Sequence, residues 1–142
     1  MSSKLKDLIP MLMCHDVQRS IAFYRETLGF EVADRMDDVG RSGWASLRNG
    51  QARIILASPK NVPEAPRING RHTQAVHYLY PEDVAALHES LVASGRRVTD
   101  LSVRSYGMKE FELVDPDGHV LVFGQETDEP VTPEKAGSTD SE

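Results

Sequence analysis

The sequence predicts an α+β fold in which one βαβββ module occurs twice. Three pairs of signals predict this fold: two helix starts, two helix ends and two hairpin turns. The pairs are 67, 66 and 68 residues apart, and they are Asp16 and Asp83, Gly29 and Gly95, and Gly50 and Gly118. This offset is far longer than the repeat of a solenoid, so we interpret it as one duplicated module rather than an array.

The first module is expected over residues 6–58. A strand-like segment covers 8–13, and Asp16 is the N-cap of a helix whose apolar residues recur at helical spacing. Gly29 ends that helix. The remaining elements are three strands, expected over about 30–35, 43–48 and 51–58.

The first hairpin is marked by Asn49-Gly50, a strong signal for a two-residue turn, which pairs Arg48 with Gln51. Strand alternation then places Trp44 opposite Ile55 on one face. The other face is entirely apolar and is expected to pack under the helix; it consists of Ala45, Leu47, Ala52, Ile54 and Leu56.

The second module is expected over residues 73–125, after a linker over 59–72. It repeats the order of the first, with a strand over 74–80 and a helix that begins after Asp83 and ends at Gly95. The remaining elements are a short strand around Val98 and a hairpin of two strands, over 110–114 and 120–124.

The second hairpin turns at Asp115-Pro-Asp-Gly118, which suits a type I turn followed by a glycine bulge and pairs Asp115 with His119. The register without the bulge would bury the Glu112 carboxylate under the helix without a partner, so we favour the bulged one. The expected core residues are Phe111, Leu113, Leu121 and Phe123, and the expected open face holds Glu110, Glu112, Val120, Val122 and Gly124.

Composition and charge limit the classes of function. The net charge is −6, but residues 126–142 carry six acids and one lysine, which leaves about −1 for the rest. We expect this acidic end to be a disordered tail, because it has no aromatic residue and a single valine. The nearly neutral body gives no reason to expect nucleic acid. No apolar stretch approaches the roughly 20 residues that span a bilayer, and no long apolar run follows the first lysines, so we expect a cytoplasmic protein without a secretory signal.

Cys14 is the single cysteine, which excludes an intrachain disulfide and multi-cysteine zinc sites. It precedes His15, and the two residue types together can form a Cys/His nucleophile. Adjacent residues of a strand point to opposite faces, so we expect a small buried cysteine instead.

Several segments stand in an order that is typical of one superfamily: Ile9-Pro-Met-Leu12, Asp16 to Tyr24, Leu28-Gly-Phe30, Gly43-Trp44, Asn49-Gly50, Tyr106-Gly107-Met108 and Leu113 to Gly118. Over residues 6–125 the chain resembles the vicinal oxygen chelate superfamily, which includes glyoxalase I, extradiol dioxygenases and the fosfomycin- and bleomycin-resistance proteins. The last four segments are most similar to the bleomycin-resistance branch. The resemblance implies the glyoxalase/bleomycin-resistance fold, in which eight strands curl into an open groove that a homodimer completes.

Enzymes of this superfamily hold a divalent metal with one side chain from the first and the fourth strand of each module. Carried onto this chain, the four positions are Ile9, Ile55, Val76 and Val122, which form two pairs 67 residues apart. None of these aliphatic side chains has a lone pair for a metal. His77 is a neighbour of one position, but strand alternation turns it to the opposite face. We therefore expect no metal, no cofactor and no catalytic residue.

The groove is expected to bind a small molecule instead. The candidate ligand-binding residues are Met11, Met13, Trp44, Arg53, Ile55, Tyr78, Tyr106, Glu112 and Val122. Apolar and aromatic side chains would bury the ligand, while Arg53 and Glu112 would orient it, the latter through its charge on a cationic ligand. Alternatives stay open for several of these residues. Met11, Met13 and Trp44 can be ordinary core residues, and Glu112 can be a solvated surface carboxylate. Arg53 can form an ion pair with a glutamate instead of contacting a ligand.

The favoured function is therefore metal-free sequestration of an apolar or aromatic ligand, which can also be cationic, by a homodimer that resembles bleomycin-resistance proteins. Two alternatives stay open. One is an enzyme, either a glyoxalase-like lyase or isomerase or a relative that uses tyrosine and glutamate as acid–base groups. The other is an accessory dimeric domain without a ligand. Neither nucleic acid nor a membrane is expected as a partner.

Overall fold

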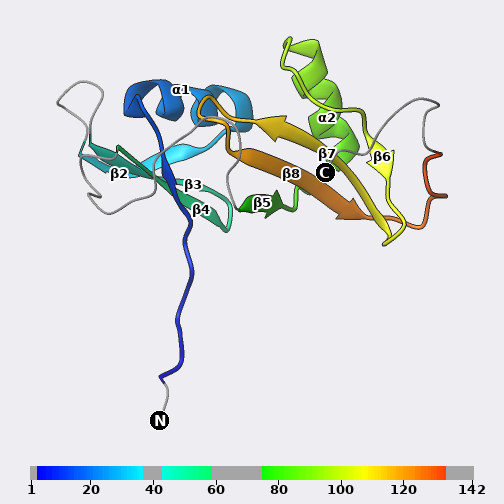
Figure 1. Cartoon of the computed structure of the whole chain (residues 1–142), viewed down its shortest axis with the longest axis horizontal. Coiled ribbons are helices and arrows are strands. Elements are labelled where there is room, and N and C mark those ends of the chain that lie inside the picture. The colour runs from blue at the N-terminus through cyan, green and yellow to red at the C-terminus, as the bar shows by residue number, and fades with distance from the viewer. Residues whose placement is uncertain (1–2, 37–42, 59–74, 134–142) are drawn as a thin grey trace. The chain divides into compact units, whose positions relative to one another are not determined.

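A computed structural model describes residues 3–36, 43–58 and 75–133 (Figure 1). In these ranges the order βαβββ occurs twice, as the sequence predicts. The first set is β1 (Met11–Met13), α1 (Val17–Leu28), β2 (Glu31–Met36), β3 (Trp44–Asn49) and β4 (Ala52–Ala57). The second set is β5 (Val76–Leu79), α2 (Val84–Ala93), β6 (Ser102–Val103), β7 (Met108–Val114) and β8 (Val120–Glu126). The predicted linker over 59–72 lies outside the described residues.

The strands form two four-stranded sheets, ordered β1-β4-β3-β2 and β5-β8-β7-β6. The predicted α+β class is therefore confirmed. The chain divides into two compact units: the first unit is Met1–Val76 with Val114–Val120, and the second unit is His77–Leu113 with Leu121–Glu142. The turn between β7 and β8 thus belongs to the first unit, although both strands run mostly in the second.

In the first unit, α1 covers one face of the sheet (Figure 1). Asp16 caps the helix by accepting a hydrogen bond from the Arg19 backbone N–H at 3.1 Å. Gly29 ends it in the left-handed conformation, with φ of 71°. The buried helix residues are Val17, Ser20, Ile21, Tyr24 and Leu28. Beneath them the sheet buries Leu12, Ala45, Leu47, Ile54 and Leu56, which include four of the five residues predicted for this face; the fifth, Ala52, is exposed.

The register of the first hairpin differs from the prediction. Asn49 pairs with Ala52 and Trp44 with Ala57, so the two turn residues are Gly50 and Gln51. Gly50 has φ of 60°, as the first residue of a glycine-first hairpin turn requires. Asn49 instead donates from its side-chain amide to the carbonyl oxygen of Leu28 at 2.8 Å, at the end of α1. Because the shift is an even number of residues, the two faces of the hairpin stay as predicted.

In the second unit, Asp83 caps α2 through a 3.0 Å hydrogen bond from the Ala86 N–H, and Gly95 follows the helix with φ of 82°. The predicted core residues Phe111, Leu113, Leu121 and Phe123 are all buried. The predicted strand around Val98 is displaced: β6 lies at Ser102–Val103, and Val98 itself makes an isolated bridge to Leu113.

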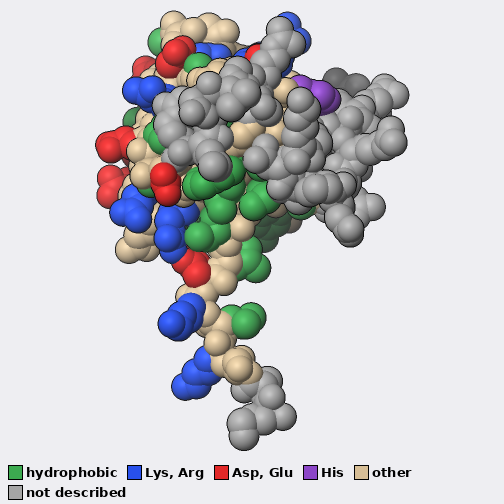
Figure 2. All heavy atoms as spheres, turned by 90° about the vertical axis from the view of Figure 1, so that its left-hand side faces the viewer, with side chains coloured by type: hydrophobic (Ala, Val, Ile, Leu, Met, Phe, Trp, Pro, Cys, Tyr) green, Lys and Arg blue, Asp and Glu red, His purple; other side chains and the backbone are tan. Residues whose placement is uncertain are grey.

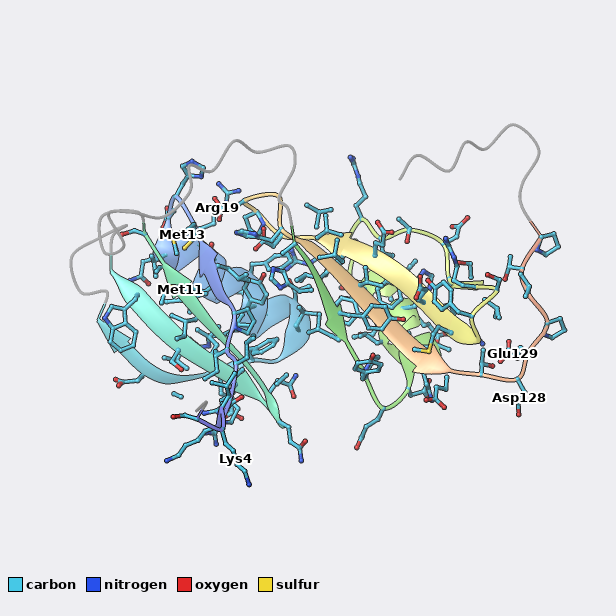
Figure 3. All side chains as sticks on the ribbon, turned by 60° about the horizontal axis from the view of Figure 1, so that its bottom comes forward. Lys4, Met11, Met13, Arg19, Asp128 and Glu129 are labelled. Atoms are coloured by element: carbon cyan, nitrogen blue, oxygen red, sulfur yellow. The ribbon has the colours of Figure 1, made fainter. Side chains whose placement is uncertain are left out.

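The segment that follows β8 carries defined contacts where the sequence predicted a disordered tail from residue 126. Lys109 forms a 3.0 Å ion pair with Glu129, and the backbone N–H of Thr132 donates to the Val103 carbonyl at 3.0 Å. These contacts tie residues 127–133 to β6 and β7, and Figure 3 shows Glu129 beyond the end of β8. Residues 134–142 lie outside the described part of the chain.

Among the described residues, no helix combines the length and the apolar character needed to cross a membrane.

Candidate functional site

The face of the first sheet that α1 leaves uncovered carries most of the predicted ligand residues of the first unit. Met11 on β1 pairs with Ile55 on β4, which in turn pairs with Ser46 on β3. The next row along the strands consists of Met13, Ala57 and Trp44. We call these six residues the first-unit open face.

The exposure of the first-unit open face varies along its rows. Met11 is 47% exposed, whereas Met13 is buried at 9%. Trp44 and Ile55 are half-buried. Figure 3 shows Met11 and Met13 following one another along β1, and Figure 2 shows hydrophobic side chains gathered on the side of the first unit that it faces. The face is therefore apolar and partly accessible.

Arg53 is engaged by an acidic residue of its own unit. Its guanidinium forms an ion pair with Asp7, which lies on the segment before β1. Both side chains are about half exposed, at 40% and 50%. The charge that Arg53 was expected to offer a ligand is therefore partly balanced by Asp7.

The second unit brings together Tyr78, Tyr106 and Glu110 on its open face. The Tyr78 hydroxyl donates to Glu110 Oε2 at 2.6 Å, and the Tyr106 hydroxyl donates to Glu110 Oε1 at 2.6 Å. Tyr80 lies beside them, with its ring centroid 5.1 Å from that of Tyr78. We call these four residues the tyrosine–glutamate cluster.

Gly124 explains how Tyr78 reaches Glu110. In the sheet, β8 lies between β5 and β7, so the Tyr78 ring has to pass over β8 to meet a carboxylate on β7. Gly124 is the β8 residue at that point: a Cβ atom there would lie 2.7 Å from Tyr78 Cζ. The absence of a side chain at 124 therefore allows the hydrogen bond, and it also explains why Gly124, predicted to be open, is buried.

The two phenols of the cluster stay protonated well beyond neutral pH. Burial and the hydrogen bond to Glu110 raise the pKa of Tyr78 and, by the same two causes, that of Tyr106. A phenolate beside the Glu110 carboxylate would place two like charges together. The tyrosines therefore act as neutral donors that hold the carboxylate in place.

The sequence pointed to Glu112 rather than Glu110 as the acidic ligand residue. Glu112 is exposed, and its backbone N–H donates a hydrogen bond to the Thr99 hydroxyl oxygen at 2.8 Å. Glu110 lies on the same strand face as Glu112. Tyr106 precedes Glu110 by four residues, and this closeness in sequence could have indicated Glu110 as the acidic residue of the site. Val122, another predicted ligand residue, is 8% exposed because β8 is an inner strand of its sheet.

A buried polar network around the β7–β8 turn was missed by the sequence analysis. Asp115 accepts hydrogen bonds from the Tyr24 hydroxyl at 2.8 Å and from the backbone N–H groups of Asp117 and His119, both at 2.9 Å. Asp117 accepts one from the Ser20 hydroxyl at 3.2 Å. Burial, with the Asp115 charge next, raises the pKa of Tyr24, which keeps its phenol a donor.

Three further contacts attach this turn to β1 and α1. His15 Nδ1 lies 2.7 Å from an Asp117 carboxylate oxygen, and His119 Nε2 lies 2.7 Å from the Met13 carbonyl oxygen. Arg19 donates to the Pro116 carbonyl at 3.0 Å, and Figure 3 shows Arg19 close to the turn. The predicted pairing of Asp115 with His119 is confirmed by a 2.9 Å backbone bond. The turn is therefore a structural anchor.

Cys14 is buried at 1% exposure, as expected, and its thiol lies 3.6 Å from the Ala57 carbonyl oxygen. Burial, with smaller contributions from the Asp117 and Asp115 charges, raises the pKa of Cys14 to about 11. His15, its neighbour, is turned to Asp117 instead. The arrangement does not provide a Cys/His nucleophile.

The raised pKa of Cys14 predicts a loss of stability at alkaline pH. The folded value lies above the ordinary value of 9.0, so the contribution is complete below about pH 9 and is lost as pH rises through about 11. The expected loss is at most about 3 kcal/mol, and Cys14→Ala should lack it. Urea unfolding of both proteins between pH 8 and 11 checks this; parallel pH profiles would contradict it.

The resemblance maps the metal positions of the superfamily's enzymes to Ile9, Ile55, Val76 and Val122, and none of these side chains offers a donor atom. Within the described ranges, no three His, Cys, Asp or Glu side chains lie close enough together to hold a metal ion. His15 and His119 are engaged by the turn, and His88 lies 3.0 Å from the Thr99 carbonyl. The donor set does not fit the family's metal.

A hollow of about 790 Å³ lies elsewhere in the first unit, between α1 and the start of β2. Its lining residues are Gln18, Ile21, Ala22, Arg25, Glu26, Gly29, Phe30, Glu31 and Val32. None of them belongs to the first-unit open face or to the predicted ligand residues. We therefore do not place the site there.

A family model described as Glyoxalase/Bleomycin resistance protein/Dioxygenase superfamily matches residues 9–123. The chain belongs to this superfamily. A search among curated proteins finds no match. As a member of the glyoxalase/bleomycin resistance superfamily, the chain has the fold that its repeated segments predicted.

Several solved structures resemble the chain. SMU.1112c is 29% identical, with 86% of this chain and 100% of that protein aligned at a TM-score of 0.68. A bleomycin-binding protein complexed with bleomycin is 24% identical, with 86% of this chain and 99% of that protein aligned at a TM-score of 0.67. Lactoylglutathione lyase from Agrobacterium tumefaciens is 19% identical, with 86% of this chain and 95% of that protein aligned at a TM-score of 0.67. The last two likenesses show the fold alone, and they include both a binding protein and an enzyme.

Proposed function

We propose that this protein binds and sequesters a small apolar or aromatic ligand that carries a positive charge, and that it does so without a metal. The observation that carries the proposal is the chemistry of the four positions to which the family's metal ligands map, all of them aliphatic. The tyrosine–glutamate cluster of the second unit adds an anionic group. A pocket with apolar walls and few oriented polar groups suits binding. The bleomycin-binding protein of the same superfamily supports the idea by analogy.

In this proposal the first-unit open face buries the apolar part of the ligand. Trp44, Met11 and Ile55 supply accessible apolar surface on one sheet face. Arg53, held by Asp7, orients the ligand from the next row of the sheet. Tyr78, Tyr106, Glu112 and Val122 are the predicted ligand residues of the second unit, to which we add Glu110.

Trp44→Ala is expected to weaken binding of a planar aromatic ligand by about 1–3 kcal/mol, because the indole surface would no longer be buried against it. Trp44 is the single tryptophan, so its fluorescence reports binding in the wild type, and calorimetry compares the two proteins. Gln51→Ala, in the exposed turn of the same hairpin and outside the first-unit open face, is the control. Equal affinities of the wild type and Trp44→Ala for every aromatic probe would remove Trp44 from the site.

The alternative is an enzyme that uses the tyrosine–glutamate cluster for acid–base chemistry. Glu110 with two neutral phenols offers an acceptor and two donors, which is what proton transfer requires. Turnover of a glyoxalase-type substrate that disappears in Glu110→Gln would favour the enzyme over the binding protein.

We further propose that the protein acts in the cytoplasm as a homodimer, as the family resemblance implies. Leu5 and Leu8, which are 91% and 84% exposed, offer apolar surface for a second copy. Light scattering is expected to give about twice the chain mass of 15.8 kDa. A mass equal to one chain would contradict the dimer.

A further inference from the structure

The tyrosine–glutamate cluster has the properties of a preorganised anionic subsite. Tyr78 is 37% exposed, Tyr80 75% and Tyr106 61%, so their rings are accessible. Each oxygen of the Glu110 carboxylate already accepts one short phenol hydrogen bond, and this fixes the plane of the carboxylate. All four residues belong to the second unit.

The backbone around the cluster also fixes its geometry. The turn after Tyr106 is held by the Gly107 N–H, which donates to the Arg104 carbonyl at 3.0 Å, and by the Thr127 N–H, which donates to the Gly107 carbonyl at 3.0 Å. Gly107 has φ of 83°, a conformation that favours glycine. Gly124 keeps the path of Tyr78 clear. The cluster therefore does not depend on a ligand to assemble.

Within the described residues no ion pair joins Glu110 to a basic side chain, although the charge of Arg104 acts on the neighbouring Tyr106 phenol. The nearest lysine on the same strand, Lys109, forms its ion pair with Glu129. The hydrogen bonds that Glu110 accepts come from neutral phenols. The cluster thus keeps one negative charge among three aromatic rings, a combination that attracts cations.

The hydrogen bonds already made decide which cation fits best. A primary ammonium group has three N–H donors that need acceptors. Each oxygen of Glu110 already accepts one phenol hydrogen bond, from Tyr78 or from Tyr106, so fewer of its lone pairs remain for a primary ammonium group. An N-alkylated ammonium group, by contrast, needs few acceptors and is recognised by charge and by ring faces.

We infer that the tyrosine–glutamate cluster is the subsite that recognises an N-alkylated, tertiary or quaternary, ammonium group of the ligand. This inference rests on the proposed function and names the chemical class of ligand. Glu110 supplies the charge, and Tyr78, Tyr80 and Tyr106 supply the ring faces.

The test compares three probes that share a benzyl group: benzyltrimethylammonium, benzylammonium and benzyl alcohol. Calorimetry and NMR signals of the tyrosine rings measure binding to the full chain. We expect benzyltrimethylammonium to bind about tenfold more tightly than benzyl alcohol, and more tightly than benzylammonium. Tighter binding of benzylammonium would overturn the inference.

Three variants locate the effect. Glu110→Gln is expected to reduce affinity for benzyltrimethylammonium about tenfold with little effect on benzyl alcohol. Gly124→Ala keeps the carboxylate but displaces Tyr78, and it is expected to reduce the same affinity several-fold. Glu89→Gln removes an exposed carboxylate on α2 and is the charge-matched control. Unchanged circular dichroism spectra and unfolding midpoints show that each variant folds.

The outcomes separate this inference from the proposed function. If all three probes bind equally and Trp44→Ala weakens each of them, the protein binds aromatic ligands but the inference is wrong. Wild-type affinity in Glu110→Gln, or a larger loss in Glu112→Gln than in Glu110→Gln, also overturns it. If no probe binds to the wild type, the inference and the proposed binding function both fail.

Discussion

Asp115→Ala is expected to lower the free energy of unfolding by about 3–5 kcal/mol, because it leaves three buried donors without their acceptor. The carboxylate is 5% exposed and accepts bonds from the Tyr24 hydroxyl and from the backbone N–H groups of Asp117 and His119. Urea unfolding followed by circular dichroism measures the loss. Asp115→Asn, which retains one oxygen, is expected to lose less.

Asp128→Ala is the control for this experiment, since it removes an exposed carboxylate beyond β8 (Figure 3). Its expected effect is within about 0.5 kcal/mol. If Asp115→Ala cost no more than Asp128→Ala, the β7–β8 turn would not anchor the first unit. Tyr24→Phe, which removes one donor of the same network, should fall between the two.

Phe111→Ala is expected to destabilise the second unit by about 3–5 kcal/mol, because it opens a cavity in the core of that unit. Phe111 is 1% exposed, stacks on Phe123 with ring centroids 5.2 Å apart, and contacts the His88 ring edge-on at 5.0 Å. Thermal and urea unfolding measure the change.

Tyr80→Ala provides a matched truncation of an aromatic residue in the same unit. Because Tyr80 is 75% exposed, its removal is expected to cost less than about 1 kcal/mol. Equal losses in Phe111→Ala and Tyr80→Ala would contradict the assignment of Phe111 to the core face. That assignment came from the bulged register of the second hairpin, so the comparison tests the register as well.

Local signals were sufficient to predict the fold. The helices are delimited by the caps Asp16 and Asp83 and by the glycines that follow each helix. These residues interact with residues close to them in the chain, so their effect can be predicted from the sequence. Strand faces depend on alternation alone, and the first hairpin shows how robust this is. Its register was wrong by an even shift, since Asn49 bonds to Leu28 and leaves the turn to Gly50 and Gln51, yet Leu47 and Ile54 kept their buried face.

The site depended on neighbours that are distant in sequence. Tyr78 meets Glu110 because β8 inserts between β5 and β7, and because Gly124 lies where the ring has to cross. The alternation of side chains along a strand does not reveal which strands are neighbours in the sheet. Nothing in the sequence therefore indicated that Tyr78 lies near Glu110, and Glu112 was predicted instead. Similarly, Asp115 and Asp117 read as ordinary turn residues, and only the packing of the turn against α1 reveals them as buried acceptors.

In the proposed function, ligand binding by this member of the superfamily needs no metal. The most direct test of this claim is elemental analysis of protein purified without chelator or affinity tag, repeated after dialysis against zinc, nickel, manganese and iron(II). We expect less than about a tenth of an equivalent of any metal, together with aromatic-ligand affinity that is unchanged by added chelator. One tightly held metal per chain, with ligand binding lost on its removal, would contradict the claim.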